Sequence, residues 1–97
     1  MSISRNSIVV ATDSQVSCVL DAETVILHFN KGVYFGLDEV GTSIWQKLQQ
    51  PQVVGRIRDA ILQEYDVDEE QCEQDVLRLL NQLHDEGLIE VRSEPAS

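Results

Sequence analysis

Two histidines and two cysteines are the side chains of this chain best suited to metal binding or nucleophilic chemistry, but their spacing suits neither. His28 lies inside an apolar run, and His84 is followed by two acidic residues that point in different directions on a helix. Cys18 and Cys72 stand alone, whereas zinc ligands usually come in close pairs such as C-x-x-C. No H-E-x-x-H, G-x-S-x-G or glycine-rich phosphate-binding motif occurs. We therefore predict no metal, no cofactor and no enzymatic activity, and we expect two buried, reduced thiols.

Acidic residues crowd the stretch from position 66 to position 75, where they could attract a cation or a basic partner. The set lacks the spacing and the central glycine of an EF-hand loop. Acidic side chains are favoured at the start of a helix by its dipole. We interpret the cluster as the solvated start of a helix, with an electrostatic docking face as the alternative. Its members are Asp66, Asp68, Glu69, Glu70, Glu73 and Asp75.

The net charge excludes two classes of partner. Seven Lys and Arg residues stand against 17 Asp and Glu, which gives a net charge of −10. A strongly acidic chain disfavours nucleic acid, because phosphate contacts need a basic face, and it also disfavours an anionic membrane surface. The first 50 residues carry three basic and five acidic side chains (net −2), and the remainder carries four and twelve (net −8). The acidity is therefore concentrated in the second half.

The location is expected to be cytoplasmic. The first apolar run, residues 8–11, is shorter than the roughly 7–15 apolar residues of a signal peptide. No stretch of the chain approaches the ~18 apolar residues of a membrane-spanning helix.

The first part of the chain contains runs of β-branched residues, which are expected to form the strands that position any site. Residues 16–20 and 24–29 are typical of strands joined by a tight turn, and residues 33–37 follow as a third strand. Residues 30–32, Asn-Lys-Gly, suit the second turn, because Asn and Gly tolerate positive φ. These segments predict a three-stranded antiparallel meander. The upstream run, residues 8–11, is expected to add either a fourth strand or a loose arm.

From residue 38 onward the apolar period becomes helical. Asp38 suits the N-cap of a first helix that ends at Gln50, because the residue before a proline disfavours helix. A second helix is expected over residues 53–65, without a strong capping side chain. A third is expected over residues 69–86.

The third helix has clear end signals. Asp68 followed by Gln71 three residues later resembles a capping box, and Gly87 suits the residue after the helix end. Residues 88–91 are expected to form a last short strand or an extended tail, and residues 93–97 a flexible end.

Strands followed by helices predict the α+β class, with the sheet packed on the helices through Val33, Phe35 and Leu37. Three helices that run into Gly-Leu-Ile-x-Val also match a winged helix-turn-helix-like arrangement. Its third helix would enter a DNA groove, yet residues 69–86 carry six acids and one arginine, a net charge of −5. Such a helix repels phosphates, so we expect the architecture to serve another use.

Two surfaces remain as candidate binding sites, and the first is the third strand. It lies at a sheet edge if the meander is sequential, and an exposed edge offers N–H and C=O groups to another strand. Its aromatic residues, Tyr34 and Phe35, are either core side chains or part of a site that adds a peptide as a further strand. A proline at either position is expected to abolish such binding where it removes an outward-facing N–H.

The second surface is the apolar face of the third helix, which is wider than a one-sided stripe requires. Part of it could line a groove beside the strand edge, or the helix could be sandwiched between two others, and the periodicity leaves both open. The face comprises Cys72, Val76, Leu79, Leu80 and Leu83, extended by Leu77.

The order of these segments resembles the PqqD-like family of RiPP recognition elements, and within it the small stand-alone proteins of lasso-peptide biosynthesis. The similar segments are Gly-Val-Tyr-Phe-Gly-Leu-Asp at 32–38, Gly-Thr-Ser-Ile-Trp-Gln-Lys-Leu at 41–48, Arg-Ile at 56–57 and the stretch from Asp75 to Ile89. The resemblance covers about residues 14–91. One departure is Gln-Val at 52–53, where the family more often has a threonine-type cap before the second helix.

The resemblance implies a winged-helix-like domain that binds the leader segment of a ribosomally made precursor peptide. The leader is expected to lie antiparallel to the third strand, in the cleft between that strand and the third helix. Backbone pairing is assigned to Val33, Tyr34, Phe35 and Gly36. Side-chain contacts are assigned to Tyr34, Val76, Leu79, Leu80 and Leu83, with Asp75 and Arg78 at the polar rim.

The resemblance also implies partners. The bound leader would be presented to a leader peptidase and a cyclase, while this chain, as a monomer or weak homodimer, performs no chemistry. Residues 14–92 are expected to form the peptide-binding domain, after an N-terminal arm or extra strand over residues 1–13. One alternative is a PqqD-type chaperone that presents a peptide to a radical SAM enzyme. Another is a winged-helix transcription adaptor that contacts protein.

Overall fold

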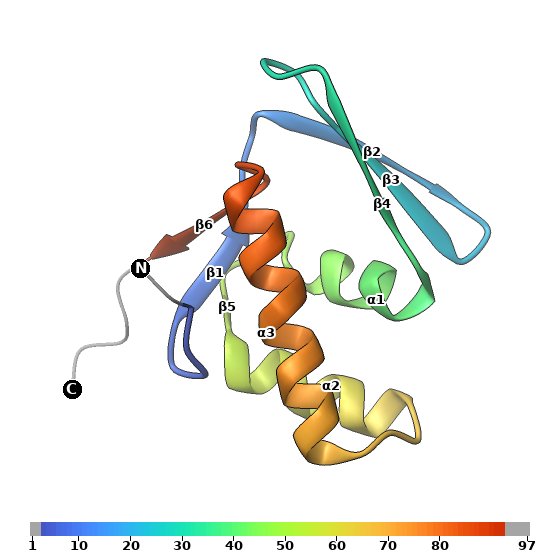
Figure 1. Ribbon diagram of the computed structural model, residues 1–97, viewed down its shortest axis with the longest axis vertical. Coiled ribbons are helices and arrows are strands. Elements are labelled where there is room, and N and C mark those ends of the chain that lie inside the picture. Colours follow the sequence, from blue (N-terminus) through green and yellow to red (C-terminus); the bar gives the residue numbers. More distant parts are fainter. Residues whose placement is uncertain (1–2, 93–97) are drawn as a thin grey trace.

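A computed structural model describes residues 3–92, which form two small sheets and three helices (Figure 1). The predicted flexible end, residues 93–97, lies outside the described residues. No helix in the described part is both long enough and apolar enough to cross a bilayer. The elements are β1 (Ile8–Ala11), β2 (Gln15–Leu20), β3 (Glu23–His28), β4 (Val33–Leu37), α1 (Glu39–Lys47), β5 (Gln52–Val53), α2 (Val54–Glu64), α3 (Glu69–Asp85) and β6 (Ile89–Arg92).

The meander forms as predicted, with β3 in the centre and β2 and β4 antiparallel on either side. Asp21 takes a φ of 59° between β2 and β3, and Gly32 takes a φ of 63° before β4. Both turns therefore use the left-handed conformation that tight hairpins require. β4 has one strand neighbour in this sheet, so it lies at an edge.

The helices begin at the predicted capping residues. Asp38 accepts a hydrogen bond from the N–H of Gly41 at 2.8 Å, and Asp68 accepts one from the N–H of Gln71 at 3.0 Å. Each bond satisfies an N–H that has no partner within its own helix. In Figure 1, α1 lies beside the meander, and α2 lies at the opposite end of the molecule and packs against α3.

The helix ends follow the prediction less closely. α3 ends before Gly87, which has a φ of 74° as expected for its position. α1 ends at Lys47, three residues before the predicted end at Gln50. The shorter helix leaves room for a turn that brings Gln52 into β5.

β1 is the main departure from the prediction, because it is neither a fourth strand of the meander nor a loose arm. It forms the centre of a second sheet, between β5 and β6, where Ile8 faces both Val53 and Arg92. Val9 is completely buried. Sequence patterns carry little sign of this sheet, since β5 is only two residues long.

α2 begins without a side-chain cap, as predicted, and the segment before β1 takes that role. The N–H of Val54 donates to the C=O of Ser7 at 3.0 Å, and that of Gly55 donates to the C=O of Arg5 at 2.9 Å. Arg5 also forms an ion pair with Glu73 of α3 at 2.8 Å. The N-terminal segment therefore ties the starts of two helices together.

The core lies between the inner face of the meander and the helices. β3 contributes Ile26 to this core, and His28 at the end of the same strand is also buried. β4 contributes Leu37 and the half-buried Phe35, whereas Val33 is 41% exposed. The expectation that Val33 packs on the helices is therefore wrong, because it lies next to the hairpin turn at the outer end of the strand.

A buried hydrogen bond at 2.8 Å joins the hydroxyl of Thr24 in β3 to that of Thr42 in α1. We expect Thr42→Val to lower the free energy of unfolding by about 1–3 kcal/mol, because it leaves the Thr24 hydroxyl buried without this partner. The double variant T24V/T42V should lose less than the sum of the two single variants, since no polar group is then stranded. Urea unfolding of the four proteins measures this coupling, and additive losses would contradict it.

Candidate functional site

The direction of the ladder hydrogen bonds decides which backbone groups of β4 are free to pair with another chain. Successive residues of an antiparallel strand direct their N–H and C=O groups to opposite sides. Phe29, just after β3, donates its N–H to the C=O of Ser14 on the β2 side at 2.9 Å. The C=O of His28 accepts from the N–H of Gly32 on the β4 side, also at 2.9 Å. The even-numbered residues of β3 therefore bond to β4.

Phe35 pairs with Ile26 and Val33 pairs with His28, so Phe35 and Val33 use their backbone groups on β3. Tyr34 and Gly36 alternate with them and direct their N–H and C=O groups to the open edge. The expected backbone site at residues 33–36 is thereby reduced to Tyr34 and Gly36. A proline at Phe35 would break the sheet instead of removing an outward N–H.

An open cleft with a volume of about 580 Å³ lies between β4 and α3. Residues of β4, α1, α2 and α3 line this cleft. Because Phe35 and Leu37 point to the same face of the strand, the cleft opens directly beside the edge groups of Tyr34 and Gly36. Its apolar lining includes Phe35, Leu37, Val40, Ile44, Val76 and Leu79.

α3 supplies four of the predicted site residues to this cleft. Val76 is buried and Leu79 is half-buried, and both line the cleft. Asp75 and Arg78 also line it and form an ion pair at 2.9 Å, with both side chains more than half exposed. The structure thus brings these four residues to the edge of β4.

Leu80 and Leu83 lie elsewhere on the same helix. Both are completely buried in the core, so the expectation that they contact a peptide is wrong. Each helical residue is rotated by about 100° from the one before, and this turns Leu80 away from the cleft that Leu79 lines. The wide apolar face of α3 is therefore shared between the cleft and the core.

The Tyr34 side chain lies on the opposite face of the sheet from the cleft and is 70% exposed. Strand alternation sends Phe35 inward and Tyr34 outward, so the expected side-chain contact of Tyr34 with the cleft is also wrong. Cys18 lies on this outer face and is exposed, contrary to the expectation of a buried thiol. The other exposed apolar side chains of the face are Val16, Leu20 and Val25.

Cys72 is the second free thiol; it is buried and lines the cleft. Burial raises the pKa of its thiol, and the neighbouring carboxylate of Asp75 raises it further. A thiol that stays protonated is a poor nucleophile and a poor metal ligand. Within residues 3–92, no group of three His, Cys, Asp or Glu side chains is placed to hold a metal ion. The arrangement suits the binding of an extended apolar segment.

Several lining residues are absent from the set assigned from the sequence, namely Leu37, Val40, Ile44 and Val67. The helical spacing of Val40 and Ile44 marks them as one covered face. Spacing shows that a face is covered, but the covering group can be the chain itself or a ligand. The helical spacing of these positions was therefore visible in the sequence, but it did not show whether the chain or a ligand covers them.

Comparison with known proteins agrees with this geometry. A family model described as "Coenzyme PQQ synthesis protein D (PqqD)" matches residues 23–89, which include β3, β4 and all three helices. No curated protein matches the chain.

Two solved structures share the fold. "TbiB1 in Complex with the TbiA(beta) Leader Peptide" is 39% identical, covers 88% of this chain and 99% of its own, and superimposes with a TM-score of 0.79. "Lasso peptide synthetase B1 complexed with the leader peptide" is 21% identical, covers 84% of this chain and 96% of its own, and has a TM-score of 0.74. The second likeness concerns the fold alone.

Proposed function

The chain belongs to the PqqD family, and from that premise we propose that it is a RiPP recognition element of lasso-peptide biosynthesis. It binds the leader segment of a ribosomally made precursor peptide as an added strand on β4. The observation that carries the proposal is the open edge at Tyr34 and Gly36 directly beside an apolar cleft. The likeness to TbiB1, a structure described with a leader peptide, supports it.

In the proposed mode the leader runs antiparallel to β4 and exchanges backbone hydrogen bonds with Tyr34 and Gly36. The leader residues that lie opposite Phe35 and Leu37 direct their side chains to the same face of the sheet as these two residues. Every second leader side chain therefore enters the cleft. Those side chains are apolar, because they meet Val76 and Leu79 there. The Asp75–Arg78 pair borders the cleft on the solvent side.

The bound leader is presented to a leader peptidase and a cyclase, which perform the chemistry. This chain is a non-catalytic adaptor, in keeping with the raised pKa of the Cys72 thiol in its cleft. Peptide binding is assigned to residues 14–92, while the segment before residue 14 contributes β1 to the fold. The chain acts as a monomer or weak homodimer in the cytoplasm, where ribosomal precursors are made.

Titration calorimetry of the full chain with the leader of a precursor encoded beside it tests the proposal. We expect one leader to bind per chain, with the same affinity in the presence of EDTA. Duplex DNA at low salt should give no binding, because the acidic α3 repels phosphates. A scrambled leader of the same composition is the control, and equal affinity for the two peptides would refute the proposal.

A further inference from the structure

The cleft extends past the end of β4, where no strand edge accompanies it. Beyond Leu37 its walls are the start of α1 and the first half of α3, and it reaches Val67 in the loop between α2 and α3. β4 runs toward Leu37, so a peptide paired antiparallel with it brings its N-terminal side to this end. The residues that precede the paired segment of the peptide therefore lie between α1 and α3.

Asp38 lines this end of the cleft, and three more acidic residues lie next to it or to Val67 in the chain; we call the set Asp38, Glu39, Asp66 and Asp68 the acidic mouth. Asp38 lines the cleft, and Asp66 and Asp68 flank the lining residue Val67 in the chain. None of the ion pairs within residues 3–92 includes any of the four. Asp38 and Asp68 are also fixed in place, since each accepts a backbone N–H of the helix that it caps, at 2.8 and 3.0 Å.

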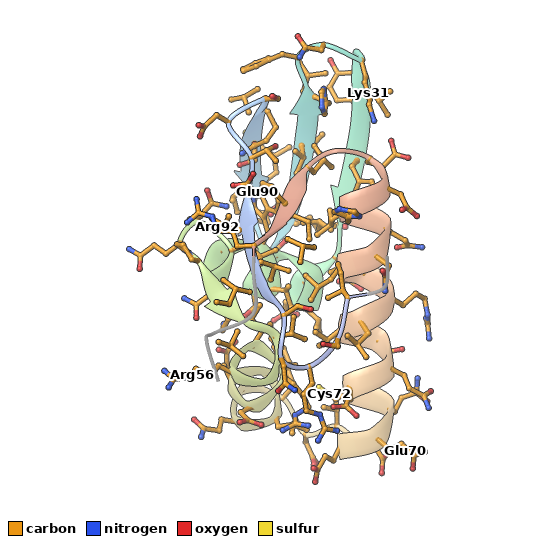
Figure 2. The ribbon with its side chains drawn as sticks, turned by 90° about the vertical axis from the view of Figure 1, so that its left-hand side faces the viewer. Lys31, Arg56, Glu70, Cys72, Glu90 and Arg92 are labelled. Atoms are coloured by element: carbon orange, nitrogen blue, oxygen red, sulfur yellow. The ribbon has the colours of Figure 1, made fainter. Side chains whose placement is uncertain are left out.

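The basic side chains of the chain are engaged or distant. Five of the seven are held by acids in ion pairs, namely Arg5, Lys47, Arg58, Arg78 and Arg92. Figure 2 shows Lys31 at the opposite end of the molecule from Glu70, which marks the start of α3. Arg56 extends from α2 on the side away from α3 in the same view. Within residues 3–92, the acidic mouth is therefore paired with no basic side chain.

The hydroxyl of Tyr65, at the end of α2, lies in the same electrostatic field. Its pKa is raised first by burial and then by Glu39, Glu64 and Asp38. Glu64 is bound to Lys47 at 2.7 Å, and this hydrogen bond lowers the pKa of Glu64. Glu64 is thus paired with a basic side chain, whereas no ion pair within residues 3–92 includes Asp38 or Glu39.

We propose that the acidic mouth selects leader peptides that carry lysine or arginine just before the segment paired with β4. This inference rests on the proposed function, because the antiparallel leader on β4 sets which peptide residues reach the mouth. A basic side chain can lay its aliphatic stem along the apolar cleft while its charge meets the fixed carboxylates. Acidic leader residues at the same place are repelled. The cleft selects leader peptides with apolar side chains, and the acidic mouth selects among them by charge.

Selection from a phage library of random peptides of about fifteen residues, with the full chain as bait, tests the proposal. The neutral variant D38N/E39Q/D68N removes three charges of the mouth. Asparagine caps helices about as well as aspartate, so α1 and α3 keep their starts. The control variant D13N/D21N/D85N removes three exposed charges that lie outside the cleft lining and belong to no ion pair within residues 3–92.

We expect the wild type and the control to enrich Lys or Arg just before an alternating apolar pair, and the neutral variant to keep the pair without the basic residues. A selected peptide should bind the neutral variant about tenfold more weakly at low salt, and added NaCl should narrow that gap. An apolar pair without basic preference, or with basic residues after it, overturns the role of the mouth but leaves the proposed function standing. Selections that yield no alternating apolar pair overturn the proposed function itself.

Discussion

Leu79→Glu is expected to weaken leader binding by about ten- to a hundredfold while the chain stays folded. Leu79 is half-buried on α3 and lines the cleft that receives the inward side chains of the leader. In the free protein a glutamate there can reach water, but bound leader would bury its carboxylate against apolar atoms. Burial of an unpaired polar group costs about 1–3 kcal/mol in proteins, and each 1.4 kcal/mol is a factor of ten in affinity. Titration calorimetry with the cognate leader measures the loss.

Leu77→Glu is the matched control for this variant. Leu77 lies two residues away on α3, is half-buried like Leu79 and packs on the core, but it is outside the cleft lining. We expect similar thermal midpoints for the two variants and near wild-type leader affinity for Leu77→Glu alone. If Leu79→Glu unfolds the chain while Leu77→Glu does not, Leu79 is a core residue and the assigned site is wrong.

The meander and the starts of α1 and α3 were predictable because each depends on neighbours in the chain. Asp38 and Asp68 cap helices through N–H groups three residues away, and Gly32 supplies the positive φ of a short hairpin. The second sheet was not predictable, because β1 is held by β5 and β6, which lie more than 40 residues further along the chain. Local patterns carry no information about such pairings when one partner is only two residues long.

The sequence indicated which two elements form the candidate site, but not which of their residues face it. The edge position of β4 and the contribution of α3 follow from strand order and apolar spacing. The division of α3 into Leu79 at the cleft and Leu80 in the core depends on the rotation of the helix about its axis, which spacing alone leaves undetermined. The same holds for the side of β4 to which Tyr34 directs its N–H, since this depends on the register with β3.

The charge distribution links the fold to its use. In a winged-helix DNA-binding protein the third helix enters a groove between the phosphate backbones, but α3 is capped here by Asp68 and begins with Glu69 and Glu70. One side of α3 lines a cleft beside a strand edge, and the lining residue Val67 lies in the acidic segment that leads into α3. An architecture that resembles a DNA reader therefore carries acidic residues where a DNA reader needs basic ones.

Tyr34→Pro is expected to weaken leader binding by about tenfold or more and to change the stability of the free chain by less than about 1 kcal/mol. The N–H of Tyr34 faces the open edge, so proline removes a donor to the leader without removing a ladder bond to β3. The proline ring also occupies the space that the added strand needs. Backbone hydrogen bonds supply much of the affinity when a peptide adds to a sheet, and each is worth about 0.5–1.5 kcal/mol net.

Two further variants separate the backbone of Tyr34 from other effects. Tyr34→Ala keeps the N–H and removes a side chain that points away from the cleft, so we expect leader affinity within about threefold of wild type. Phe35→Pro removes the N–H that pairs with Ile26 and should lower the free energy of unfolding by about 2 kcal/mol or more. Thermal unfolding and leader titration of the three variants give distinct patterns. Equal loss of binding in Tyr34→Ala and Tyr34→Pro would show that the leader contacts the outer face of the sheet, and strand addition at this edge would then be wrong.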